Sequence, residues 1–395
     1  MRDDSTVTLR EHWLLDPSIT FLNHGSFGAT PRAVLEKQSE YRARLEAEPV
    51  RFLVRELEPL LDAARRDVAA FIRAEPEDVV FVPNATAGVN AILRSLDLDE
   101  HDELLVTNQE YNACRNTLDY VAQLAGAKVV AVEIPFPIAS PDVVVDRVLA
   151  AVTERTRVLL IDHVVSQTAI INPVERLVQE MSARGIDTLV DGAHAPGMFP
   201  LDVTAIGAAY YTGNLHKWVC APKGAAFLHV RRNRRFGVRP IAISHGANSM
   251  RSDRPRLWLE FDWTGTFDPA AWLAAADAIR FVPTLVPGGW PEVMRRNHEL
   301  ALRGRDLVAG ALGIDAPAPG NMIGSMASLP LPDAPPGTPG GDNDPLHNLL
   351  FDRHQIEVPV MPWPHPPKRL IRLSAQLYNR EDEYAELGRV LRSIL

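Results

Sequence analysis

The chain has 395 residues, of which 46% are hydrophobic and 23% are charged. This composition is that of a soluble globular protein and argues against a disordered, fibrous or membrane-embedded class, while the length predicts two or three domains. The formal net charge of -9 argues against a general attraction to nucleic acid or to an anionic membrane.

The first segment of the chain, residues 1–17, has acidic residues early and lacks an apolar stretch of signal-peptide length. The sequence holds no uninterrupted apolar run long enough to cross a bilayer. We therefore expect a cytoplasmic protein with no membrane partner. Residues 30–74 come next and are predicted to be helical, because Pro31 suits a helix start and Leu, Val and Ala recur on one face.

The central part of the chain, from about Asp78 onward, alternates short apolar runs with longer helix-like stretches. This alternation predicts a parallel sheet covered by helices. The runs are apolar throughout, which is typical of strands buried on both faces. The seven candidate strands are Asp78–Val82, Glu103–Thr107, Lys128–Val132, Val158–Ile161, Thr188–Val190, Ala208–Thr212 and Ala225–His229.

The last third of the chain returns to a mixed pattern. Residues 268–312 are predicted to be rich in helix, and the stretch Pro330–Pro345 is so dense in Pro and Gly that it must form a loop. From about Leu346 the pattern predicts a helix, two strands and a final helix. The two strands are Ile356–Met361 and Arg369–Ser374, and the helix is Asp382–Leu395.

Together these elements predict an α/β fold. We expect a large domain with a mostly parallel seven-stranded sheet between helices, and a small α/β domain formed by the N- and C-terminal segments. The expected boundaries are an N-terminal arm at 1–30, the large domain at 31–285 and the small domain at 286–395.

The strongest chemical signal is an aspartate and a lysine that each follow a predicted strand. Asp191 ends a strongly apolar strand, at the edge where open α/β sheets bind ligands. Lys217 is followed directly by the apolar run Trp218–Cys220. Most lysines keep their charge at the surface, but a buried lysine has a lowered pKa, so its neutral amine can attack an aldehyde and form an imine.

Pyridoxal 5'-phosphate (PLP) would use both residues. PLP acts as an electron sink when its pyridine nitrogen is protonated, and a carboxylate such as Asp191 keeps that nitrogen protonated. The segments VDGAHAPG, GNLHKW and APKGAAFLH together resemble the class V aminotransferase superfamily of fold type I PLP enzymes. The segments FLNHGSFGATP, EPVRFL and RLIRLSAQLYN resemble its isopenicillin N epimerase-like branch, and the resemblance runs from about Leu14 to Leu395.

The resemblance implies PLP as the cofactor and an amino acid as the substrate. It makes Lys217 the Schiff-base lysine and Asp191 the partner of the pyridine nitrogen, with His194 near the phenolic oxygen. Ala85 and Thr86 follow a strand and open a helix, where backbone N–H groups and the Thr86 hydroxyl can hold a phosphate. An ordinary helix cap is the alternative interpretation of this motif.

Further cofactor contacts are implied at four positions. Tyr111 occupies the place where the family stacks an aromatic ring on the pyridine, although a core tyrosine is the alternative. Asn214 and His216 match further phosphate contacts, in a motif where many members have Ser-Gly in place of Asn214-Leu215. Ser166 matches a turn that faces the cofactor.

The resemblance also implies a homodimer with active sites at the subunit interface. Thr266, in the segment WTGT, corresponds to a loop that reaches the phosphate bound to the neighbouring subunit. A simple turn residue is the alternative interpretation of Thr266.

The substrate carboxylate is expected to bind Arg372 on the predicted strand RLIRLS. A guanidinium suits this task because it stays charged and forms two parallel hydrogen bonds with a carboxylate. Arg369 lies three residues earlier, so it points to the opposite face of the strand. In the N-terminal segment NHGSFG, Gly25 would permit close backbone approach, while His24 and Phe27 would line the pocket.

The two cysteines help to choose between reactions. Cys114 and Cys220 show neither metal-ligand nor disulfide-framework spacing, so we predict no metal site. Cysteine desulfurases of the superfamily use a nucleophilic cysteine on a loop of the C-terminal part, and this chain has no cysteine beyond Cys220. Persulfide chemistry is therefore disfavoured.

Two reactions remain open. An epimerase would use Lys217 on one face of the substrate and a second acid or base on the other, for which His24, His194 or a tyrosine is available. The alternative is a C–S β-lyase, or a decarboxylating or deaminating enzyme, that acts on a cysteine-derived conjugate. A catalytically silent protein of the same fold is disfavoured by the joint presence of Lys217, Asp191 and Arg372.

Overall fold

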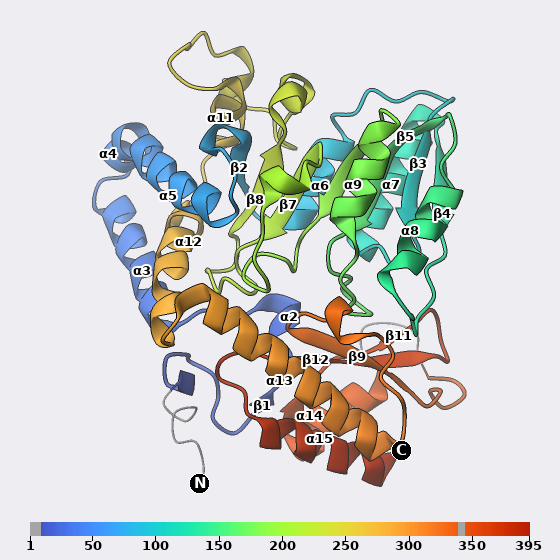
Figure 1. Cartoon of the computed structure of the whole chain (residues 1–395). Coiled ribbons are helices and arrows are strands. Elements are labelled where there is room, and N and C mark those ends of the chain that lie inside the picture. The colour runs from blue at the N-terminus through green and yellow to red at the C-terminus, as the bar shows by residue number, and fades with distance from the viewer. Residues whose placement is uncertain (1–8, 339–343) are drawn as a thin grey trace.

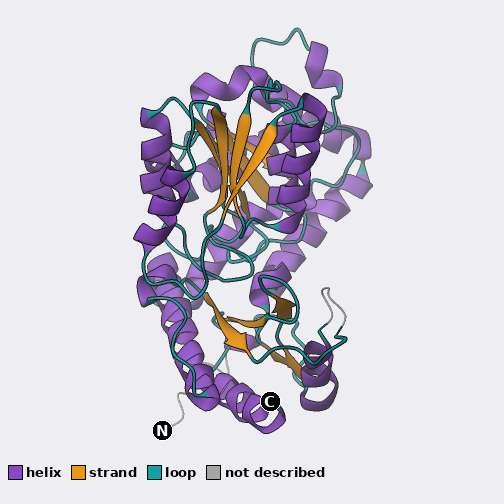
Figure 2. Ribbon diagram, turned by 90° about the vertical axis from the view of Figure 1, so that its right-hand side faces the viewer, coloured by secondary structure: helices purple, strands orange, loops and turns teal. Residues whose placement is uncertain are grey.

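The computed structural model describes residues 9–338 and 344–395. A seven-stranded sheet forms its centre, with the strand order β2-β8-β7-β6-β5-β3-β4. Figure 2 shows helices on both faces of this sheet and a smaller group of strands and helices at one end. The strands of the large sheet are β2 (Val79–Val82), β3 (Glu103–Thr107), β4 (Lys128–Val132), β5 (Thr156–Asp162), β6 (Asp187–Asp191), β7 (Tyr210–Asn214) and β8 (Ala226–Val230).

These seven strands confirm the predicted mostly parallel α/β fold, with two differences of detail. Strand β8 runs antiparallel to both of its neighbours, β7 and β2. The expectation of strands apolar and buried on both faces is wrong for β4, where Lys128 and Ala131 are exposed. The physical reason is that β4 is an edge strand with a single neighbour, β3, so less of it needs to be covered.

Alternate side chains of each strand enter two separate apolar cores. Phe81, Leu105 and Ile161 face a core that helices α3, α5, α8, α9 and α12 complete. Val80 and Leu160 face the opposite core, completed by α6, α7 and α11. The helices of the two layers are α3 (Arg32–Ala47), α5 (Leu57–Phe71), α6 (Ala85–Leu93), α7 (Asn112–Ala125), α8 (Pro141–Ala150), α9 (Val174–Ala183), α11 (Arg256–Phe261) and α12 (Ala270–Phe281).

The predicted helical stretch of residues 30–74 is divided at Glu48. Its carboxylate accepts hydrogen bonds from the N–H groups of Val50 and Arg51, which caps a new helical start. The chain then continues through α4 (Pro49–Arg51) and the π-helical turn η1 (Phe52–Glu56) into α5. Further short helices are α2 (His24–Phe27), η2 (Pro76–Asp78), α10 (Val203–Ile206), η3 (Arg232–Gly237), η4 (His245–Asn248), η5 (Val282–Leu285) and η6 (Gly320–Met322).

The smaller part of the molecule joins both ends of the chain, as predicted. An antiparallel sheet has the order β11-β12-β9, and the N-terminal strand β1 pairs in parallel with β10. Helices α13 and α15 lie side by side along it in Figure 1. The elements are β1 (Thr20–Phe21), α13 (Gly289–Leu312), β9 (Met326–Leu331), α14 (Pro345–His354), β10 (Ile356–Glu357), β11 (Val360–Pro362), β12 (Arg369–Ser374) and α15 (Glu381–Ile394).

The strand predicted at Ile356–Met361 is wrong as a single element. Its two ends form β10 and β11, which belong to different sheets and are separated by Val358 and Pro359. Because Pro359 has no backbone N–H, it interrupts a continuous ladder at this point. In the predicted loop at 330–345, residues 339–343 lie outside the described part of the chain, as do residues 1–8 of the predicted arm.

No helix within the described residues is both long and apolar enough to cross a membrane.

Candidate active site

Polar side chains gather where the parallel strands of the large sheet end. Asp162 and Asp191 are paired across the last position of β5 and β6, and Asn214 ends β7. The carboxyl ends of parallel strands form the edge at which α/β sheets bind ligands. A cavity of about 360 Å³ opens there, lined by Ser26, Phe27, Pro83, Asn84, Ala85, Thr86, Tyr111, Asp162, Ser166, Asp191, Ala193, His194, Asn214, His216, Lys217, Lys223 and Gly224.

Lys217 lies in the wall of this cavity, shortly after the end of β7. Its amine nitrogen is 2.9 Å from Nε2 of His194. Burial lowers the pKa of Lys217 to about 7, and the charge of Arg372 adds to this effect, while Asp191 opposes it. The neutral amine is therefore well populated near neutral pH, which is the form that attacks an aldehyde.

Asp191 is a buried carboxylate that accepts two hydrogen bonds. The backbone N–H of Ala193 donates to Oδ1 at 2.9 Å, and the thiol of Cys114 donates to Oδ2 at 3.1 Å. Burial raises the pKa of Asp191, and these two donors oppose that shift. The structure thus brings Asp191 and Lys217 into one cavity, as the sequence led us to expect.

Two further buried carboxyl groups lie beside Asp191 and were not predicted. Burial raises the pKa of both Glu110 and Asp162 well above the ordinary range, and the charge of Asp191 raises each further. Asp162 offered the same signal as Asp191, a carboxylate at the end of an apolar strand. Glu110 gave no comparable signal, because only the fold brings its loop beside Asp191.

The N-terminus of α6 forms one end of the cavity. The Asn84 side chain caps the helix by accepting from the N–H of Ala87 at 2.8 Å. The N–H of Ala85, which we expected to be a phosphate donor, instead donates to Oδ1 of Asn214 at 2.8 Å. Thr86 lines the cavity in the first helical turn, where the positive end of the helix favours an anion. Asn214 therefore holds this helix end in place.

His216 and Tyr111 also line the cavity. Nδ1 of His216 lies 3.1 Å from the carbonyl oxygen of Ala225, and burial lowers the pKa of His216 to about 4. Tyr111 is the residue before α7, and its side chain is 43% exposed, so it is not the core tyrosine of the alternative interpretation.

Arg372 is a buried cation on β12. Its guanidinium donates to the carbonyl oxygen and hydroxyl of Ser166, at 2.6 and 3.2 Å, and to the hydroxyl of Ser26 at 2.8 Å. Within the described residues it forms no ion pair. Arg369 lies on the other face of the strand and pairs with Asp344 at 3.0 Å. A buried guanidinium without a counter-ion favours an anionic ligand, since an unpaired buried charge is costly.

The N-terminal loop contributes to the cavity differently from our expectation. His24 does not line it, because its ring is buried between the Tyr378 hydroxyl, at 2.7 Å, and the carbonyl oxygen of Lys217, at 3.0 Å. Gly25 is also buried, and its N–H donates to the Ser374 hydroxyl at 3.0 Å. Phe27 lines the cavity and is 74% exposed. Ser26, which we had not singled out, contacts Arg372.

Thr266 lies apart from this site. It is exposed on the connection between α11 and α12 and is not among the residues that line the cavity. Within one chain, the structure does not bring Thr266 to the residues predicted to hold the phosphate.

A model of the Aminotransferase class-V family matches residues 21–314. The chain belongs to this family. It is 37% identical to isopenicillin N epimerase of Amycolatopsis lactamdurans, over 98% of this chain and 97% of that protein. It is 30% identical to a probable chloroplastic L-cysteine desulfhydrase of Arabidopsis thaliana, over 94% of this chain and 82% of that protein.

Solved structures share the fold. C-DES with glycine covalently linked to its PLP cofactor superimposes with a TM-score of 0.80 at 18% identity, over 97% of this chain and 98% of that chain. The class-V family uses PLP, and this chain is a PLP-dependent enzyme of that family. The cavity fits this cofactor, because it combines an amine of lowered pKa, a buried carboxylate and the positive end of a helix.

Proposed function

We propose that this enzyme acts at the α-carbon of an amino-acid substrate, as an epimerase similar to isopenicillin N epimerase. The observation that carries the proposal is Arg372, a buried guanidinium with no ion pair in the described chain, whose charge acts on Lys217. Such a cation suits the carboxylate of an amino acid, and the two residues that it contacts, Ser26 and Ser166, both line the cavity that contains Lys217. The 37% identity to an isopenicillin N epimerase supports the choice of reaction.

Each part of the cavity has a proposed role. Lys217 would bind the cofactor aldehyde and would move the α-proton, and Asp191 would keep the ring nitrogen protonated. PLP would supply the electron sink that stabilises negative charge at the α-carbon. Thr86 and His216 would hold the phosphate, and Tyr111 would contact the ring. Asn214 would support the phosphate site indirectly, because its side chain accepts a hydrogen bond from the N–H of Ala85.

The second proton transfer has two candidates in the cavity. His24 was one of the groups considered, but its ring contacts Tyr378 and the backbone of Lys217, outside the cavity lining. His194 and Tyr111 both line the cavity. Burial lowers the pKa of His194 well below its usual value, so this ring can accept a proton but holds it weakly.

A C–S lyase is the second candidate function. It is supported by the 30% identity to a probable L-cysteine desulfhydrase and needs no nucleophilic cysteine. Both cysteines of this chain are buried, neither lines the cavity, and burial raises the pKa of each thiol. These positions disfavour persulfide chemistry and leave elimination from an S-substituted cysteine as the competing reaction.

Product analysis distinguishes the two functions. The holoenzyme is incubated in D₂O with a panel of amino acids and cysteine conjugates, and proton NMR follows the α-hydrogen. Exchange of the α-hydrogen with racemised product and no fragmentation supports epimerisation. Release of pyruvate and ammonia from an S-substituted cysteine contradicts epimerisation and establishes the lyase. A protein that shows no cofactor absorbance in the visible range contradicts both functions.

We also propose a homodimer in which Thr266 completes the phosphate site of the partner subunit. The proposal is supported by two observations: Thr266 is exposed and does not line the cavity of its own chain, and its segment resembles the loop that the family uses for a shared contact. The predicted domain boundaries near residues 30 and 285 belong to the same proposal, with the cavity between the large sheet and the N-terminal residues Ser26 and Phe27.

A further inference from the structure

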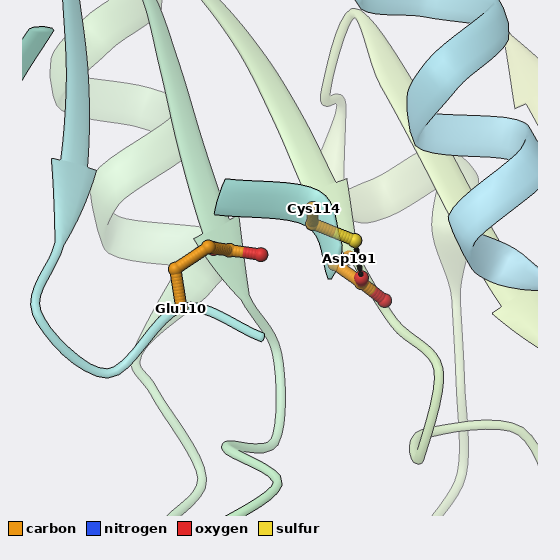
Figure 3. Close-up of side chains that lie close together, drawn as sticks. All are labelled: Glu110, Cys114 and Asp191. Atoms are coloured by element: carbon orange, nitrogen blue, oxygen red, sulfur yellow. Dashed lines mark hydrogen bonds between the residues drawn. The ribbon is translucent and has the colours of Figure 1, made fainter. Parts of the chain in front are cut away.

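Cys114 approaches the carboxylate of Asp191 from the first turn of α7. Its Sγ lies 3.1 Å from Oδ2 of Asp191, and neither residue is appreciably exposed. Figure 3 shows the sulfur directed at the carboxylate, with Glu110 on the loop that precedes the helix. The thiol is therefore within hydrogen-bonding distance of the group proposed to hold the ring nitrogen of the cofactor.

The thiol keeps its proton in this position. Burial raises the pKa of Cys114 well above its usual value, and the charges of Asp191 and Glu110 raise it further. A protonated thiol can only donate toward a carboxylate oxygen. Cys114 is thus a hydrogen-bond donor to Asp191 and is a poor nucleophile or metal ligand, although the ligand atoms of Glu110, Cys114 and Asp191 lie within 4.8 Å of one another.

The Cys114 donor affects the charge of Asp191 because other buried carboxyl groups lie nearby. Glu110, Asp162 and Asp191 lie together in a buried cluster, where neighbouring negative charges disfavour one another. Burial raises the pKa of both Glu110 and Asp162 well above the ordinary range, which disfavours their charged forms. Asp191 accepts hydrogen bonds from the N–H of Ala193 and the S–H of Cys114, and these two bonds favour its charged form.

We propose that Cys114 is a positioning residue that keeps Asp191 ionised and directed at the ring nitrogen of PLP. The thiol donates to one carboxylate oxygen and the Ala193 N–H donates to the other, and together these bonds restrain the orientation of the carboxylate. This inference rests on the proposed role of Asp191 but adds a residue that acts only through it. An alanine at position 114 would remove the donor, whereas a serine would retain one of similar size.

The test compares Cys114→Ala with Cys114→Ser and measures the cofactor rather than turnover. The dissociation constant for PLP is measured by equilibrium dialysis, and the visible absorbance of each holoenzyme is titrated with pH. We expect Cys114→Ala to bind PLP about threefold to tenfold more weakly, the loss of one ordinary hydrogen bond, because a thiol is a weak donor. We also expect its absorbance midpoint to move to higher pH, because a ring nitrogen that loses its proton withdraws fewer electrons from the lysine-bound nitrogen.

Leu118→Ala is the matched packing control. Leu118 is buried on the same helix, one turn later, and is not among the hydrogen-bond partners of Asp191. The Leu118→Ala variant should have a lower melting temperature than the wild type but the same absorbance midpoint. Cys114→Ser should restore the wild-type midpoint.

The outcomes separate this inference from the proposed function. A Cys114→Ala enzyme with a wild-type midpoint and PLP affinity overturns the positioning role while leaving the PLP enzyme intact. A Cys114→Ser enzyme that behaves like the alanine variant also overturns it, since a donor at this position would then be irrelevant. A wild-type protein that binds no PLP overturns the proposed function and the inference together.

Discussion

The amine of Lys217 and the imidazole of His194 face each other across 2.9 Å, with Arg372 acting on both through its charge. Burial lowers the pKa of both groups, to about 7 for Lys217, so the neutral form of the Lys217 amine is well populated near neutral pH and the charged form of His194 is disfavoured. The centre of the cavity therefore contains a base that can receive a proton and an amine that can become a nucleophile.

Lys217→Ala should abolish the covalent attachment of the cofactor to the protein and reduce turnover below detection. Lys223→Met is the matched control, because Lys223 is the other lysine in the cavity wall. Borohydride reduction followed by mass measurement of the two denatured proteins checks this assignment. The assignment fails if Lys217→Ala keeps a borohydride-reducible cofactor and Lys223→Met loses it.

Attachment of PLP to the apoenzyme should accelerate as pH rises through about 7. The pKa of Lys217 is lowered from 10.5 to about 7, so the reactive neutral amine is scarce below that pH and abundant above it. Arg372→Gln removes the second cause of the lowering and should shift the midpoint to higher pH. Stopped-flow absorbance gives the rates, and a rate that is flat between acid and alkaline pH would contradict the lowered pKa.

Arg372→Gln should raise KM for the amino acid by about 100-fold, roughly the loss of a charge-assisted interaction of about 3 kcal/mol. Arg369→Gln should instead leave KM nearly unchanged and destabilise the protein by about 3 kcal/mol, because Asp344 would lose its buried partner. Steady-state kinetics and urea unfolding of both variants separate the roles. Equal effects of the two substitutions on KM would contradict the assignment of substrate binding to Arg372 and of a stabilising ion pair to Arg369.

Gly28→Ala should destabilise the protein and weaken PLP binding. Gly28 has φ +71, and an added Cβ would meet the backbone carbonyl of His216, next to Lys217. Gly185→Ala is the matched control, because Gly185 has φ +73 but nothing within 4 Å of the added carbon. Both variants carry the conformational cost of about 1 kcal/mol, so a larger loss of melting temperature in Gly28→Ala reports the clash alone. Equal losses would show that the close approach is unimportant.

Mixed dimers test the role of Thr266. Lys217→Ala and a variant that replaces Thr266 with Lys should each be weakly active or inactive, since one lacks the amine and the other disturbs the phosphate contact. If Thr266 serves the partner subunit, a mixed dimer contains one site with both defects and one with neither. The two variants are unfolded, mixed in equal amounts and refolded together. The mixture should then recover up to about a quarter of wild-type activity, because half of the dimers are mixed and half of their sites are intact. No recovery, with mixed dimers present, would place Thr266 outside the shared site.

The seven strands and the pair Lys217 and Asp191 could be predicted because local sequence encodes them. Buried strands are continuous apolar runs, and a lysine among apolar residues after such a run is a strong departure from ordinary composition. Arg372 could likewise be separated from Arg369 by the period of two along a strand. The two arginines were expected on opposite faces of the strand, and they have different partners in the structure: Arg372 contacts Ser26 and Arg369 pairs with Asp344.

The contacts that depend on distant segments could not be predicted. The sequence of NHGSFG does not show that His24 faces Tyr378, because the two are 354 positions apart. The Ala85 N–H donates to Asn214, which lies 129 positions away, and the helix motif alone does not reveal this contact. The hydrogen bond from the Cys114 thiol to Asp191 depends on the packing of α7 against the end of β6, which the local sequence does not show.

The parallel pairing of β1 with β10 has a consequence for the order of assembly. Asn23 donates to the carboxylate of Glu357 at 2.7 Å, across 334 positions, and thereby secures the loop that bears Ser26 and Phe27. During synthesis, the large sheet is complete once Val230 has been made, whereas this loop must wait for β10. The strand that bears Asp191 and the segment that bears Lys217 are thus synthesised well before the strand that secures the substrate wall, so the two sides of the cavity are completed at different stages of synthesis.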